Sequence, residues 1–125
     1  MILDTNALSA LAERDNSILD LVRPAPFLCV TLISLGEYRY GISLSRKRAD
    51  LDRWLDRFLE QARVLLPDLQ SLPHYAAVRR QLKEAGTPIP ANDCWIAALV
   101  LQHELPLVTK DQHFKKVKGL RTLTW

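Results

Sequence analysis

Short apolar runs recur along the chain between longer segments of mixed polarity. They are MIL at the start, FLCV at 27–30, VLLP at 64–67, PLVT at 106–109 and LRTLTW at 120–125. Continuous apolar runs of this length are typical of strands that are buried on both faces of a sheet. The pattern therefore predicts five short strands.

The segments between these runs have a helical pattern. One helix is expected through ALSALAER, with cap chemistry available from Thr5 and Asn6, and another starts at Thr31 and continues through LISLGEYRYGISLS. A third is expected over about 47–62, where a core-facing stripe recurs at three- and four-residue spacing: Leu51, Leu55, Phe58 and Leu59.

Two more helices are expected in the second half of the chain. One includes HYAAVRRQLKEAG and ends at Gly86, and the other covers CWIAALVLQHE after a cap at Asn92 or Asp93. Strands that alternate with helices predict an α/β fold, an α/β/α sandwich with a central, mostly parallel sheet. No repeat or linker interrupts the pattern, so residues 1–125 are expected to form a single domain.

Composition fits this fold and excludes several classes of protein. The chain has 125 residues, of which 48% are hydrophobic and 25% charged, as in ordinary globular domains. The apolar run around WIAALVL is far shorter than the roughly 20 residues that cross a bilayer. No membrane span is expected, and Asp4 interrupts the start where a secretory signal would be apolar, so a cytoplasmic location is expected.

Cysteine and histidine give no pattern of a zinc site. Cys29 and Cys94 lie far apart in apolar surroundings, which predicts two buried thiols. His74, His103 and His113 lack metal-ligand spacing and are interpreted as ordinary residues. Zinc is therefore disfavoured.

Net charge gives a weaker indication of a partner. The chain carries a net charge of +3, and its basic residues are clustered around 46–48, 79–83 and 110–118. Such clusters can follow the phosphates of a nucleic acid, but they are equally expected on solvated helix faces.

Four of the 14 acidic residues occupy special positions in the predicted fold. Asp4 ends the first strand, Asp93 starts the apolar helix and Asp111 follows the strand PLVT, so these three can converge on one edge of a parallel sheet. Glu37 lies on a helix face of small and apolar residues, where a carboxylate is costly without compensation.

Each of these carboxylates also has a structural interpretation. Asp4 and Asp93 are possible helix caps, Asp111 a possible Asx-turn residue, and Glu37 a partly exposed helical glutamate. Taken together, however, four carboxylates at one sheet edge repel one another unless a divalent cation binds between them. Oxygen ligands favour Mg²⁺, with Mn²⁺ also possible.

The segments around these residues resemble a known family. LDTNALS, TLISLGEYRYG, IPANDCWIAALVL and LVTKDQHFKKVKGLRTLTW are similar, in order and spacing, to the PIN-domain ribonucleases and, among them, the VapC toxins of prokaryotic toxin-antitoxin pairs. Gly36 departs from the family, in which alanine is more usual before the glutamate, and could loosen its helix by about 1 kcal/mol.

The resemblance implies a function and a set of site residues. It implies an Mg²⁺-dependent endoribonuclease in which Asp4, Glu37, Asp93 and Asp111 are the catalytic and metal-binding quartet. Asn6 and Thr109 match polar positions that support the acidic cluster. It also implies an RNA substrate, a cognate VapB-type antitoxin and a homodimer.

Proteins of other classes are alternatives. One is a non-catalytic PIN-like module that binds RNA or a partner, and against it stands the complete quartet. A haloacid-dehalogenase-type phosphatase is disfavoured because that chemistry expects an aspartate where this chain has Asn6. A DNA-directed nuclease stays open, because metal ligands do not read the sugar.

Overall fold

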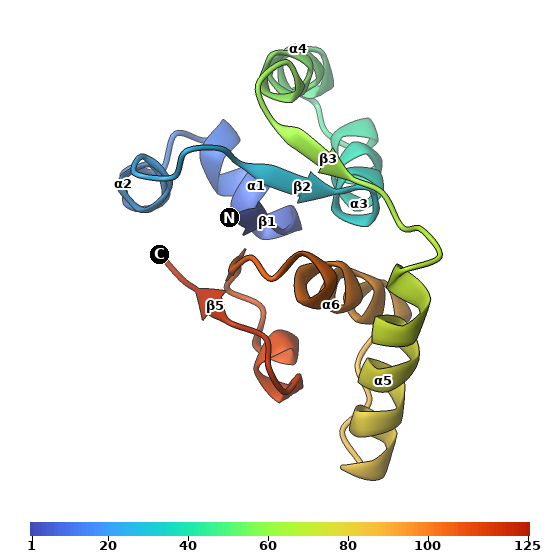
Figure 1. Cartoon of the computed structure of the whole chain (residues 1–125). Helices are drawn as coiled ribbons and strands as arrows, with labels where there is room; N and C mark the ends of the chain where they lie inside the picture. Colours follow the sequence, from blue (N-terminus) through green and yellow to red (C-terminus); the bar gives the residue numbers. More distant parts are fainter.

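Five parallel strands form a single sheet in the order β3-β2-β1-β4-β5, in a computed structural model that describes all residues 1–125 (Figure 1). The strands are β1 (Ile2–Leu3), β2 (Cys29–Thr31), β3 (Arg63–Leu65), β4 (Leu107–Val108) and β5 (Thr122–Leu123). In register, Ile2 lies beside Cys29 on one side and Leu107 on the other. The predicted strands and their parallel arrangement are thus confirmed.

Six α-helices and one short 3₁₀ helix surround the sheet. They are α1 (Thr5–Ala12), α2 (Asn16–Val22), α3 (Leu32–Ser43), α4 (Arg48–Leu59), α5 (Ser71–Glu84), α6 (Ala91–His103) and the 3₁₀ helix η1 (Gln112–Lys116). Figure 1 shows α4 and α6 on opposite sides of the strands. No helix is both long and apolar enough to span a membrane.

The alternation of side chains along each strand creates two cores. Leu3, Val30 and Val108 face one side of the sheet, where they pack with buried residues of α1, α2, α3 and α4. The preceding residue of each strand faces the other side, where it packs with residues of α5, α6 and η1. Helices on both faces confirm the predicted α/β/α sandwich.

The helix boundaries correct the sequence analysis in the first half of the chain. The first helix was expected to run through Arg14, but it ends at Ala12, and α2 follows as a separate helix that was not predicted. Arg14 adopts a positive φ of 58°, which helical residues avoid, and Asp15 then caps α2 by accepting a hydrogen bond from the N–H of Ser17.

Candidate active site at the carboxyl edge of the sheet

The four predicted carboxylates line one small cavity of about 90 Å³ at the edge where the strands end. Asp4 follows β1, Asp111 follows β4, Glu37 lies in α3 and Asp93 lies in the first turn of α6. The remaining lining residues are Thr5, Asn6, Ile96 and Phe114. Four separate elements therefore contribute acidic side chains to one place.

Asp4 is the most deeply buried of these carboxylates, with 4% of its surface exposed. Its Oδ1 accepts a hydrogen bond from the N–H of Ala7 at 3.1 Å, and its Oδ2 accepts one from the hydroxyl of Thr109. Burial raises the pKa of Asp4 to about 6, and the two hydrogen bonds offset only part of that effect. The expectation that Thr5 or Asn6 caps α1 is wrong, because Asp4 itself is the cap.

Asp93 is held at the amino end of α6 without acting as its cap. The helix begins at Ala91 after Pro90, which corrects the expected cap at Asn92 or Asp93. Asp93 is therefore inside the first turn, where the helix dipole favours a negative charge. Burial raises the pKa of this carboxyl, His113 lowers it, and nearby Asp111 raises it further.

His113 joins this cluster, which the sequence analysis did not predict. Its Nδ1 lies 2.8 Å from Oδ2 of Asp93 and 3.3 Å from Oδ1 of Asp111. Asp111 positions His113. The carboxylate of Asp111 accepts a hydrogen bond from the backbone N–H of His113, and this contact closes the Asx turn at the start of η1. The pair Asp-x-His after a predicted strand was the available signal, but it does not match a known metal-ligand spacing.

Glu37 receives its compensation from α1. The hydroxyl of Thr5 donates to Oε1 of Glu37 at 3.1 Å, and the glutamate is half-buried. Arg39 does not contribute, because it pairs with Asp52 and Asp56 of α4 at 2.8 and 2.9 Å. Glu37 therefore enters the cavity with one hydroxyl as its hydrogen-bond donor.

Thr109 and Asn6 connect the loop after β4 to the start of α1. The Thr109 hydroxyl accepts from the N–H of Asp111 at 2.9 Å, and the side-chain oxygen of Asn6 accepts from the N–H of Lys110 at 3.2 Å. Both polar residues thus fix the backbone that carries Asp111.

The chemistry of these side chains suits a divalent cation. One ligand atom each from Asp93, Asp111 and His113 lies within 4.8 Å of the others. Two ligands of a cation bound at about 2.1 Å stand roughly 3 Å apart, which is comparable to the spacing of the His113 nitrogen from the two carboxylate oxygens. The desolvated carboxylate of Asp4 in the same cavity adds negative charge that a cation would offset.

Known proteins match the chain over nearly its full length. The PIN domain family matches residues 1–120. Ribonuclease VapC2 of Rickettsia felis is 28% identical over 129 residues, covering 99% of this chain and 96% of that protein. Ribonuclease VapC5 of Mycobacterium tuberculosis is 28% identical over 125 residues, covering 94% and 87%.

Solved structures give the same result. The chain is similar to VapBC2 from Rickettsia felis bound to a promoter DNA fragment, with a TM-score of 0.88, 26% identity and coverage of 99% and 97%. It is also similar to VapBC-1 from nontypeable Haemophilus influenzae, with a TM-score of 0.85, 28% identity and coverage of 99% and 96%. By its sequence match and its fold, the chain belongs to the PIN domain family.

Proposed function

We propose that this protein is a metal-dependent endoribonuclease, the VapC-type toxin of a toxin-antitoxin pair. The observation that carries the proposal is the convergence of Asp4, Glu37, Asp93 and Asp111 on one cavity at the carboxyl edge of the sheet. The relatives named as VapC ribonucleases support the same activity. Mg²⁺ is the proposed cofactor, since the cavity offers mainly carboxylate oxygens, and Mn²⁺ is the alternative.

Each carboxylate has a proposed task in hydrolysis of the RNA backbone. Asp4 and Asp93 are the proposed direct ligands, because both are buried and face the same cavity. Glu37 and Asp111 are more exposed and complete the site by orienting the attacking water. Thr109 and Asn6 hold the residues around Asp111 in place.

A divalent cation held by Asp4 and Asp93 would act as a Lewis acid that offsets the phosphate charge and lowers the pKa of water. In-line attack of water on phosphorus then breaks the bond to the 3′-oxygen of the preceding ribose. The proposed products carry a 5′-phosphate and a 3′-hydroxyl. Without the cation, the four carboxylates would repel the substrate phosphate.

The cleavage assay compares the wild-type protein with Asp4→Asn and with Asp20→Asn, an exposed aspartate of α2 that serves as the matched control. We expect Asp4→Asn to abolish Mg²⁺-dependent cleavage and Asp20→Asn to retain it. EDTA should stop the reaction and added Mg²⁺ should restore it. Wild-type cleavage by Asp4→Asn would refute the assignment, and cleavage that persists in EDTA would indicate a metal-free ribonuclease.

The proposed partner is a VapB-type antitoxin. Its support is that the similar structures from Rickettsia felis and Haemophilus influenzae are VapBC complexes. We also propose that residues 1–125 form one domain, since both the second and the 123rd residue lie in strands of one sheet. The proposed location of this domain is the cytoplasm. Expression in cells should arrest growth, and co-expression of the neighbouring antitoxin gene should relieve the arrest.

A homodimer is proposed from the apolar surface between β3 and α5. Large side chains are exposed along this stretch: Val64, Leu66, Leu69 and Leu72, of which Leu69 is 81% exposed. Contiguous exposed apolar residues of this kind are typical of protein interfaces. Sedimentation equilibrium should give a dimer for the wild-type protein and a monomer for Leu69→Asp, and a monomeric wild-type protein would exclude this arrangement.

The non-catalytic PIN-like module is the second candidate. It retains the fold but predicts RNA binding without cleavage at any Mg²⁺ or Mn²⁺ concentration. The retained carboxylates argue against it, because buried acidic side chains are costly unless they serve a function.

A further inference from the structure

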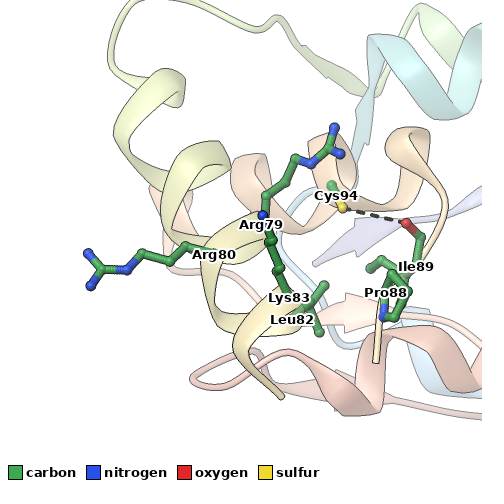
Figure 2. Close-up of a pocket in the computed structure, with 7 residues that line it drawn as sticks. All are labelled: Arg79, Arg80, Leu82, Lys83, Pro88, Ile89 and Cys94. Carbon is green, nitrogen blue, oxygen red and sulfur yellow. Dashed lines mark hydrogen bonds between the residues drawn. The ribbon is translucent and has the colours of Figure 1, made fainter. Parts of the chain in front are cut away.

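A hollow of about 460 Å³ lies between α5, the segment 88–90 and the first turn of α6 (Figure 2). Its volume falls within the range of roughly 300 to 1,000 Å³ that is usual for small-molecule sites. We call it the basic pocket, and its lining residues are Arg79, Arg80, Leu82, Lys83, Pro88, Ile89 and Cys94.

The basic pocket and the carboxylate cavity share one turn of helix. Asp93 lines the cavity, and Cys94, the next residue of α6, lines the pocket. Consecutive residues of a helix point about 100° apart, so this turn forms the wall between the two hollows. An RNA chain whose phosphate lies at Asp93 can therefore reach the basic pocket with a neighbouring nucleotide.

The carboxylate cavity alone cannot hold an RNA strand. At about 90 Å³ it is much smaller than a nucleotide requires, and its carboxylates repel a polyanion. Most of the binding energy of a nucleic acid comes from phosphate contacts with basic side chains. Those contacts must come from surfaces beside the cavity.

The polar wall of the basic pocket has an oriented cation. Arg79 donates from Nη1 to the hydroxyl of Tyr75 at 2.9 Å, and Tyr75 in turn stacks on Trp95 with ring centroids 3.9 Å apart. In Figure 2 the Arg79 side chain extends toward the turn that carries Cys94, whereas Arg80 extends in the opposite direction. Arg80 is neutralised there by Glu84 at 2.9 Å.

The floor of the pocket is apolar. Leu82 and Cys94 are buried, and Ile89 is half-buried beside them. The Sγ of Cys94 lies 3.9 Å from the carbonyl oxygen of Ile89, so the segment 88–90 is held against α6. An apolar floor below a cationic wall complements a nucleotide, because a base can pack on apolar side chains and its phosphate is negatively charged.

A second group of basic residues lies where the C-terminal segment contacts α5. Gln81 donates from Nε2 to the carbonyl oxygen of Lys116 at 2.9 Å, and its Oε1 accepts from the N–H of Lys118 at 3.1 Å. These two contacts hold the backbone of Lys116 and Lys118 against α5 at Gln81. His113 of η1 borders the carboxylates, so η1 connects these lysines with the carboxylate cavity.

We propose that the basic pocket binds one nucleotide of the RNA strand next to the scissile phosphate. Its base lies on the floor formed by Leu82, Ile89 and Cys94, and its phosphate is held by Arg79 and Lys83. The inference rests on the proposed ribonuclease function and adds to it the binding position of one nucleotide of the substrate.

The first test maps the site on the wild-type protein. A ¹⁵N-labelled sample in EDTA and low salt is titrated with hexauridylate, and amide shifts are followed by NMR. We expect shifts in the second half of α5 and at 88–94. Shifts confined to other surfaces would overturn the proposal. Shifts in this region that a Glu-rich peptide causes and the RNA does not would also overturn it, and would assign the pocket to a protein segment.

The second test compares variants by fluorescence anisotropy with the same RNA in EDTA. Arg79→Gln and Lys83→Ala should each weaken binding, by roughly threefold to tenfold at low salt, and reduce the slope of log K against log salt by about 0.7. Arg53→Ala is the matched control, because Arg53 is an exposed arginine of α4 that lines neither hollow, and this variant should bind nearly as the wild-type protein does. Equal affinity and slope in all four proteins would overturn the proposal.

These measurements separate the pocket from the proposed function. Binding in EDTA does not require cleavage, and cleavage is tested independently by Asp4→Asn. If Asp4→Asn abolishes cleavage while Arg79→Gln leaves RNA affinity unchanged, the nuclease assignment stands and the pocket assignment fails. If the wild-type protein does not cleave RNA but the amide signals of the basic pocket shift with RNA, the pocket assignment stands and the nuclease assignment fails.

Discussion

The hydroxyl of Thr109 donates a hydrogen bond to Oδ2 of Asp4, although the two residues are 105 positions apart in the sequence. The same hydroxyl accepts the N–H of Asp111 at 2.9 Å. One side chain at the end of β4 therefore orients a carboxylate at the end of β1 and the backbone of a second acidic residue. Its contribution can be measured without removing any carboxylate.

Thr109→Val should lower the affinity for Mg²⁺ about 10- to 100-fold, the usual effect of losing a hydrogen-bond partner of a metal ligand. The substitution keeps the shape of this buried side chain but leaves Oδ2 of Asp4 without its donor. Titration calorimetry measures the affinity. Thr109→Ser retains the hydroxyl and is the control, so equal weakening by serine and valine would show that packing, not the hydrogen bond, is responsible.

Asp4→Asn should stabilise the metal-free protein at pH 7. Burial raises the pKa of Asp4 from 3.8 to about 6, so the folded state binds a proton more tightly than the unfolded state. The free energy of unfolding therefore falls as the pH rises from about 4 to 6, by an amount on the order of 3 kcal/mol from this residue. Asparagine carries no charge and avoids that loss.

Thermal unfolding in EDTA checks this pH dependence. The difference in Tm between Asp4→Asn and the wild-type protein should be largest near pH 7 and should vanish near pH 4. Added Mg²⁺ at pH 7 should raise the Tm of the wild-type protein more than that of the variant, because the cation offsets the buried charge. A Tm difference that does not depend on pH would contradict the assigned cause.

His113 should raise the affinity of the site for Mn²⁺ more than its affinity for Mg²⁺. Its Nδ1 lies 2.8 Å from Asp93 and 3.3 Å from Asp111, and imidazole is a better ligand for Mn²⁺ than for Mg²⁺. Pulsed electron paramagnetic resonance of the Mn²⁺-loaded protein should show modulation by a coordinated imidazole nitrogen. The modulation should be absent in His113→Ala and present in His103→Ala, whose side chain lies at the far end of α6.

Gly36→Ala should stabilise the protein by about 1 kcal/mol, which corresponds to roughly 4 °C in Tm. Gly36 lies inside α3, and a Cβ atom added there meets nothing within 4 Å. Gly86→Ala is the contrasting variant, because Gly86 has open space but a φ of 69° after α5. It should destabilise by roughly 1 to 2 kcal/mol, the cost of left-handed backbone in a residue with a side chain. Equal effects of the two variants would refute the backbone argument.

Much of the fold could be predicted because its signals are local. Apolar runs mark the five strands, and helical spacing marks α3, α4, α5 and α6. The break between α1 and α2 was missed because it depends on the positive φ of Arg14, and the sequence has no glycine there to indicate it. The N-caps were misassigned because several neighbouring polar residues have side chains that can cap a helix. The choice between Asp4 and Thr5 depends on where β1 ends.

The sequence by itself determined that Asp4 and Asp111 follow strands and that Asp93 lies near the start of a helix, because apolar runs and helical spacing are local signals. Only the tertiary structure decided what surrounds them. The contacts of Asp4 with Thr109, of Glu37 with Thr5 and of His113 with Asp93 join residues 20 to 105 positions apart. Such contacts depend on how helices pack against the sheet, and so does burial, which raises the pKa of Asp4. Desolvation is a property of the assembled core and cannot be read from neighbouring residues in the chain.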